Sequence, residues 1–113
     1  MKYLVTGNNQ KFNDELIQNA LEDLSDKDQI LITASTIIED QVARYAFEVG
    51  AGLRTEAPDN ALRGNSSRLD AIRSLAKSAD YMVLFIKKRD KEINEIRMVG
   101  EEEGLDIREY FEL

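Results

Sequence analysis

The chain has 113 residues, of which 42% are hydrophobic, and its formal net charge is −7 at neutral pH. This length suits one compact domain, 1–113, and the single proline and the lack of low-complexity runs indicate no linker. Cysteine and histidine are absent, which excludes disulfides, thiolate or imidazole metal ligands and the commonest general base. We therefore expect neither a metal site nor a cofactor.

The acidic charge balance argues against binding to a DNA or RNA backbone, which requires clustered lysine and arginine. No apolar run approaches the roughly 20 residues that cross a bilayer. The chain begins Met-Lys and enters an apolar run without a signal-peptide pattern. These features predict a soluble, cytoplasmic protein that does not bind membranes.

Short apolar runs alternate with amphipathic helical patterns along the whole chain. The predicted strands are Lys2–Thr6, Gln29–Ala34, Leu53–Ala57, Tyr81–Ile86 and Leu105–Phe111. Helices are expected between them, and their predicted N-caps are Asn13, Thr36, Ser66 or Ser67, and Asp90. The apolar face of the first helix extends to Leu24. The polar character of Leu53–Ala57 predicts a position at an edge of the sheet.

Strict alternation of strand and helix with right-handed crossovers predicts an α/β fold. We expect a Rossmann-like three-layer domain in which a five-stranded parallel sheet carries helices on both faces. The runs Lys2–Thr6 and Tyr81–Ile86 are the most apolar and should be central, which predicts the strand order 3-2-1-4-5. In such sheets ligands bind beyond the carboxyl ends of the strands where the order reverses, here between strands 1 and 4.

Three stretches resemble the SLOG superfamily, especially its small YspA/YpsA-like branch. Val5-Thr6-Gly7-Asn8-Asn9 followed by Phe12-Asn13-Asp14 resembles the opening of that family. Asp40-Gln41-Val42-Ala43-Arg44-Tyr45-Ala46 resembles its aspartate-led second helix, and Ala79-Asp80-Tyr81-Met82-Val83-Leu84-Phe85 resembles its fourth strand. The resemblance covers nearly the whole chain. It implies a Rossmann-like fold that binds nucleotides or nucleotide-derived ligands, and some members cleave base from sugar.

The chain departs from this family in its glycine motifs. It has Ala34-Ser35 where the family has a Gly-Gly pair, and Asn9 where the family often has arginine. It has Lys87-Lys88-Arg89-Asp90 in place of a Gly-Thr turn. Glycines in such loops let the backbone approach a pyrophosphate closely. The phosphate-binding loops that the resemblance implies therefore lack most of their glycines in this chain.

Polar residues at the ends of the predicted strands are the candidate ligand contacts. They are Thr6, Gly7, Asn8, Asn9, Ser35, Thr36 and Lys87, with a second rim of Arg63, Asn65 and Arg68 before the third helix. A purely structural interpretation is open for each group. Gly7-Asn8-Asn9 suits a tight turn, and Thr36 with Glu39 has the capping-box spacing. The carboxylates of Glu39 and Asp40 would also repel an anion at that helix start.

We therefore expect a small nucleotide- or nucleotide-derivative-binding module that is not catalytic. One alternative is a base–sugar hydrolase or deoxyribosyltransferase-like enzyme. The layout also resembles nucleoside 2-deoxyribosyltransferases, in which a nucleophilic glutamate follows a Gly-Thr turn, and Glu92 or Glu95 matches that position. The other alternative is a protein-interaction domain whose pocket is closed, acting as a homo-oligomer or as an adaptor to a partner enzyme.

Overall fold

The computed structural model describes residues 1–58 and 66–113. Within these residues the chain forms five strands and four helices. The strands are β1 (Lys2–Gly7), β2 (Gln29–Ile32), β3 (Gly52–Thr55), β4 (Tyr81–Ile86) and β5 (Asp106–Phe111). The helices are α1 (Asp14–Ala20), α2 (Ile37–Val49), α4 (Ser66–Ala76) and α5 (Lys91–Glu102).

All five strands are parallel and lie in the order β3-β2-β1-β4-β5, which confirms the predicted fold and strand order. The central pair is β1 with β4, where Tyr3 pairs with Tyr81 and Gly7 with Phe85. Because strand order reverses at this pair, the loops that follow β1 and β4 leave the sheet on opposite sides. The switch point therefore lies between these two loops, as predicted.

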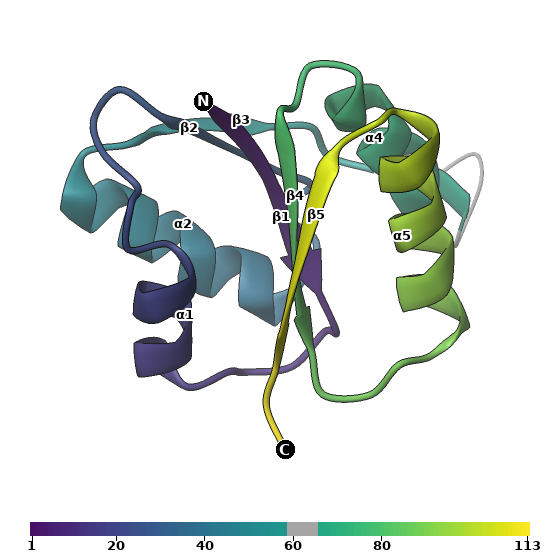
Figure 1. Ribbon diagram of the computed structural model, residues 1–113, viewed down its shortest axis with the longest axis horizontal. Helices are drawn as coiled ribbons and strands as arrows, with labels where there is room; N and C mark the ends of the chain where they lie inside the picture. The colour runs from purple at the N-terminus through teal and green to yellow at the C-terminus, as the bar shows by residue number, and fades with distance from the viewer. Residues whose placement is uncertain (59–65) are drawn as a thin grey trace.

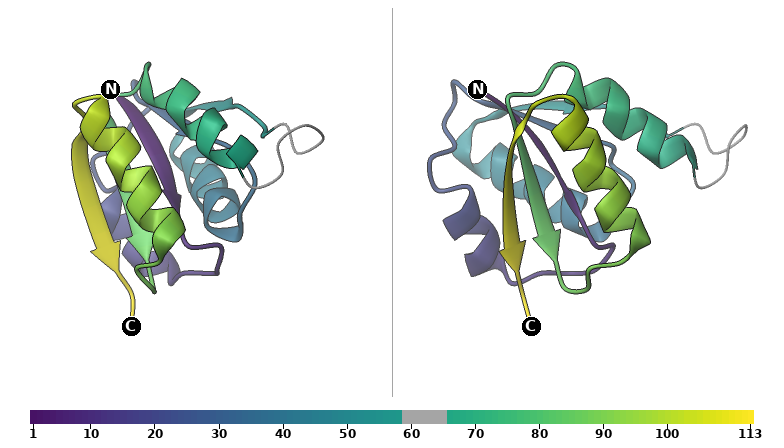
Figure 2. Two further views of the ribbon diagram at one scale, coloured as in Figure 1. Left: turned by 90° about the vertical axis from the view of Figure 1, so that its right-hand side faces the viewer. Right: turned by 45° about the vertical axis from the view of Figure 1, so that its right-hand side comes forward.

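The sheet is the middle one of three layers. Figure 1 shows α1 and α2 on one face of the sheet and α4 and α5 on the other, and Figure 2 shows α4 and α5 side by side. Each face has its own buried cluster. Val5, Ile30 and Phe85 belong to the cluster beneath α1 and α2, whereas Leu4 and Leu31 belong to the cluster beneath α4 and α5.

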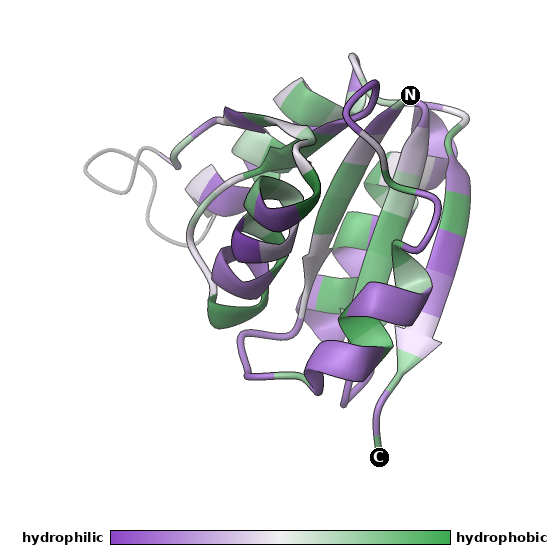
Figure 3. Cartoon of the chain, turned by 90° about the vertical axis from the view of Figure 1, so that its left-hand side faces the viewer, coloured by the Kyte–Doolittle hydropathy of each residue, from purple (hydrophilic) through white to green (hydrophobic). Residues whose placement is uncertain are grey.

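This division follows from the alternation of side chains along a strand, which sends neighbouring residues to opposite faces. A strand covered on both faces must therefore be apolar at nearly every position. In Figure 3 the central strands are coloured hydrophobic along much of their length, whereas the helices carry both hydrophilic and hydrophobic segments. None of the helices in the described ranges is long and apolar enough to span a membrane.

The predicted N-caps Asn13, Thr36 and Asp90 are confirmed, since each side chain accepts a hydrogen bond from a backbone N–H in the first helical turn. The first helix is shorter than its apolar stripe predicts. It ends at Ala20, and Leu21 and Leu24 are buried from the following turn instead. The third strand lies at an edge, as predicted, and all four of its residues are exposed.

Candidate functional site

The crevice expected between β1 and β4 is spanned by Asn8, which is only 6% exposed. Its backbone N–H donates to the carbonyl of Phe85 at 3.0 Å, and its side-chain Oδ1 accepts from the backbone N–H groups of Lys87 at 2.7 Å and Lys88 at 2.9 Å. At Gly7 a Cβ would lie 2.1 Å from the Phe85 carbonyl oxygen, so only glycine fits between these strands. These contacts tie the two loops together at the switch point.

The turn between β2 and α2 is built around the fully buried carboxylate of Glu39. Its Oε1 accepts from the backbone N–H of Thr33 at 2.9 Å and from the Thr33 hydroxyl at 2.7 Å. Its Oε2 accepts from the hydroxyl of Thr36 at 2.6 Å and from the backbone N–H of Ser35 at 3.3 Å. Ala34 adopts a left-handed conformation, with φ of 54°, which turns the backbone around the carboxylate. Glu39 thus occupies the donors that could otherwise hold an anion.

The first N–H of α2 is also used. Asn9 is exposed, and its Oδ1 accepts from the backbone N–H of Ile37 at 2.9 Å. The hydroxyl of Thr36 accepts from the N–H of Glu39 at 3.4 Å, which is one half of the predicted capping box. The other half differs, because the Glu39 carboxylate accepts from the Thr36 hydroxyl and not from the Thr36 backbone N–H. The start of α2, a position where phosphates bind in related architectures, therefore has two of its N–H groups paired within the protein.

Lys87 lies on the α1 side of the sheet edge. Its ammonium is 3.3 Å from Glu112 and lies over the ring of Phe12, 5.1 Å from the ring centre. The backbone N–H of Asn13 donates to Glu112 at 2.6 Å, and this bond lowers the pKa of the Glu112 carboxyl. Lys87 therefore joins the end of β5 to the loop before α1.

Arg68, in the first turn of α4, connects three segments that are far apart in the sequence. Its guanidinium donates to the hydroxyl of Thr6 at 2.6 Å and to the carbonyl of Gly7 at 3.4 Å, and forms an ion pair with Glu92 on α5. The Arg68 side chain is 12% exposed and that of Glu92 is 54% exposed. The buried Nε of Arg68 has no hydrogen-bond partner in the described part of the chain.

Beside this ion pair a groove of about 490 Å³ runs between α4 and α5. Its walls combine two carboxylates, two cations and three apolar side chains: Arg68, Leu69, Ile72, Lys91, Glu92, Glu95 and Ile96. Glu95 lies one turn after Glu92 and forms an ion pair with Lys91 at 3.8 Å. The structure thus brings together the candidates Arg68, Glu92 and Glu95 at one groove, while the candidate Thr6, which is fully buried, contacts Arg68 without lining the groove. The other rim candidates, Arg63 and Asn65, lie outside the described residues.

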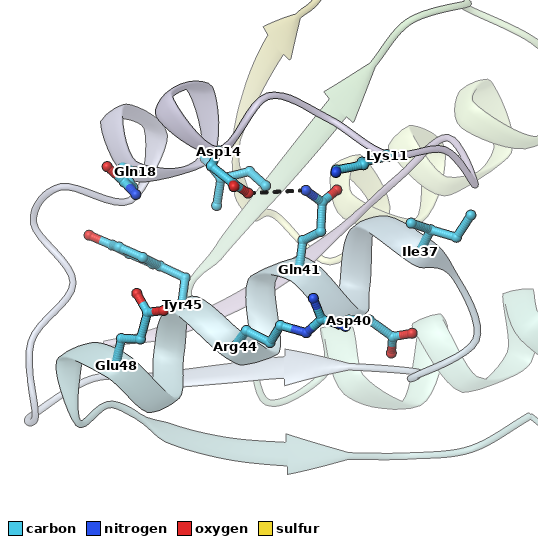
Figure 4. Close-up of a pocket in the computed structure, with 10 residues that line it drawn as sticks. Lys11, Asp14, Gln18, Ile37, Asp40, Gln41, Arg44, Tyr45 and Glu48 are labelled. Atoms are coloured by element: carbon cyan, nitrogen blue, oxygen red, sulfur yellow. Dashed lines mark hydrogen bonds between the residues drawn. The ribbon is translucent and has the colours of Figure 1, made fainter.

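A second groove, of about 450 Å³, lies between α1 and α2 and was not predicted from the sequence (Figure 4). Gln41 crosses it: its amide accepts from the N–H of Phe12, donates to the Phe12 carbonyl, and donates to Asp14 at 3.2 Å. The remaining walls carry charges of both signs, including Arg44 and Glu48. Its two cationic residues, Lys11 and Arg44, are exposed, unlike the mostly buried Arg68 of the α4–α5 groove.

Sequence reasoning missed two features of the site. The first is that the Glu39 carboxylate also accepts from Thr33 and Ser35, whereas the sequence indicated only its capping-box spacing from Thr36 and the repulsion of an anion by its charge. The second is the contact between Thr6 and Arg68, which no local sequence pattern indicates because the two residues are far apart in the chain. Among the residues that the structure describes, no three acidic side chains gather closely enough to hold a metal ion.

In its fold the protein belongs to the class of parallel, doubly wound α/β domains with a switch point between β1 and β4. No protein-family model, curated protein or solved structure matches this chain significantly, so comparison with known proteins assigns it neither a family nor a function.

Proposed function

We propose that this protein is a non-catalytic module that binds a nucleotide or nucleotide derivative in the groove between α4 and α5. The SLOG resemblance is consistent with this ligand class. The observation that carries the proposal is the mostly buried side chain of Arg68 at the rim of this groove, because an arginine in a partly desolvated setting binds phosphate or carboxylate strongly.

The groove offers complementary chemistry to the rest of such a ligand. The carboxylates of Glu92 and Glu95 can accept hydrogen bonds from ribose hydroxyls. The apolar side chains of Leu69, Ile72 and Ile96 line the same groove and can contact the face of a base. A volume of about 490 Å³ is also within the usual range for small-molecule sites. In this groove Arg68 is paired with the half-exposed Glu92 and Glu95 with the exposed Lys91, whereas the polar groups of Asn8 and Glu39 at the other turns are paired with backbone N–H groups.

A thermal-shift panel of nucleoside mono-, di- and triphosphates, free nucleosides and inorganic phosphate tests this proposal. A ligand that binds only the folded state at ten times its dissociation constant stabilises the protein by about 1.4 kcal/mol, which we expect to raise Tm by about 4–6 °C. Glu95→Gln should reduce this shift at the same ligand concentration. Glu101→Gln, at the exposed far end of α5, is the matched control and should leave the shift unchanged.

Three results would contradict the proposal. They are the absence of a shift with every compound, a shift that Glu95→Gln leaves intact, and release of free base from a nucleoside during incubation. Release of free base would indicate turnover and would favour the alternative of a base–sugar hydrolase or deoxyribosyltransferase-like enzyme. Glu92→Gln or Glu95→Gln should then abolish that release.

A protein-interaction domain with a closed pocket is the second candidate. It is favoured by the internal pairing at both Asn8 and Glu39, which leaves the two loops nearest the switch point with few groups for a ligand. The same panel separates the two candidates, since this one predicts no shift with any nucleotide.

A further inference from the structure

The edge strand β3 has one side on which no strand of the described part of the chain pairs. Among the described residues it pairs only with β2, and the N–H groups of Gly52 and Glu56 donate to the carbonyls of Asp28 and Ile32 on that side. In a parallel ladder the alternate residues direct their N–H and C=O groups the opposite way. Leu53 and Thr55 therefore present their backbone groups to the outside of the sheet, and Ala57 continues this series.

The two edges of the sheet differ in how they are protected. On β5, Glu109 forms ion pairs with Arg89 at 2.6 Å and Arg97 at 2.8 Å, and Arg108 lies over the ring of Tyr81. Dense charge of this kind discourages pairing with another strand. On β3, Arg54 is the only charged residue, and the whole strand is exposed.

The sequence around this edge is complementary to itself in charge. Register with β2 places Arg54 beside Leu31, on the α4 side of the sheet, and Glu56 points to the same side two residues later. Each reaches a serine on or beside α4: Arg54 donates to Ser78 at 3.4 Å, and Ser74 donates to Glu56 at 3.1 Å. An antiparallel pair of β3 strands centred on Thr55 would place each Arg54 opposite a Glu56.

We propose that β3 is a self-association surface, on which a second copy of this chain pairs antiparallel about Thr55. Each Thr55 faces the partner's Thr55 and exchanges backbone hydrogen bonds with it. Leu53 faces the partner's Ala57, and Arg54 faces the partner's Glu56, so two ion pairs form across the axis. Cross-strand pairs of these kinds stabilise antiparallel sheets. The pairing would join two sheets into one continuous sheet.

Two further features fit this register. Pro58 restricts Ala57 to an extended conformation, as pairing requires. Pro58 lacks an N–H, but in the alternation of this strand the backbone nitrogen of residue 58 faces β2. The outer edge therefore loses no hydrogen-bond donor. Because a strand-edge contact is small, we expect a reversible dimer with a dissociation constant on the order of 10–100 μM.

Charge reversal tests the register directly. We would measure mass by sedimentation equilibrium from about 5 μM to 1 mM for the wild type, Arg54→Glu, Glu56→Arg and the double variant Arg54→Glu/Glu56→Arg. Each single variant should weaken association at least tenfold because it places like charges opposite each other. The double variant should restore the wild-type dimer, and an equimolar mixture of the two single variants should associate although neither does so alone.

Lys88→Glu reverses a charge on an exposed residue beyond β4 and is the matched control, which should dimerise like the wild type. Far-ultraviolet circular dichroism checks that each variant is folded, and the double variant tests the register even where a single variant is not. The proposal is overturned if the wild type remains monomeric at 1 mM, or if both single variants dimerise normally. It is also overturned if neither the double variant nor the mixture associates. Nucleotide binding in the α4–α5 groove is measured separately and does not affect these outcomes.

Discussion

Replacing Glu39 with glutamine tests whether the turn between β2 and α2 depends on a buried negative charge. Glutamine has the same shape, but one of its terminal atoms is an NH₂ group that cannot accept a hydrogen bond. In wild type both carboxylate oxygens accept, Oε1 from Thr33 and Oε2 from Ser35 and Thr36. In either orientation of the amide, at least one backbone N–H loses its acceptor.

The loss can be sized from these contacts. A backbone donor left without a partner costs about 1–3 kcal/mol, and each remaining bond loses the extra strength that a charged acceptor supplies. We therefore expect Glu39→Gln to lower the free energy of unfolding by about 3 kcal/mol. With a urea m-value of about 1.5 kcal/mol/M, the unfolding midpoint would fall by about 2 M.

Urea denaturation followed by circular dichroism measures this difference. Glu48→Gln, on the exposed side of the same helix, is the matched control and should change the free energy of unfolding by less than about 0.5 kcal/mol. If Glu39→Gln unfolds within about 0.5 kcal/mol of wild type, the carboxylate does not organise this turn. The turn would then be open to an external anion, contrary to the geometry.

Two other substitutions test the two ends of the strands: Gly7→Ala lies at the carboxyl end of β1, and Asp28→Asn lies just before the amino end of β2. Gly7→Ala places a Cβ 2.1 Å from the Phe85 carbonyl oxygen, so we expect it to lower the free energy of unfolding in urea by at least about 2 kcal/mol. Gly52→Ala is the control and should cost far less, because the nearest atom to its Cβ is 3.6 Å away. Equal losses in the two variants would contradict the close approach of β1 and β4. The N–H of Ser25 donates to Asp28 and lowers the pKa of that carboxyl below its ordinary value of 3.8. Asp28→Asn should therefore lower the free energy of unfolding by about 1 kcal/mol at pH 7. The difference from wild type should disappear as the pH falls below the folded-state pKa of Asp28. A difference that does not change with pH would show that the ionised carboxylate does not supply this stability.

The sequence by itself determined the architecture of this protein. The apolar runs at Lys2–Thr6 and Tyr81–Ile86 are hydrophobic on both faces, which only a central, doubly covered strand can satisfy, and the helix caps at Asn13, Thr36 and Asp90 mark where helices begin. These are local patterns, because side-chain periodicity and capping depend on residues a few positions apart.

Only the tertiary structure decided how the polar residues at the sheet edge are used. Asn8 contacts backbone groups about 80 residues away, and Arg68 joins Thr6 to Glu92 across three elements. Whether such a group faces a ligand or the protein depends on which loops the strand order brings together. A polar side chain can bond to a ligand or to the protein itself, and the sequence alone does not show which of the two it contacts.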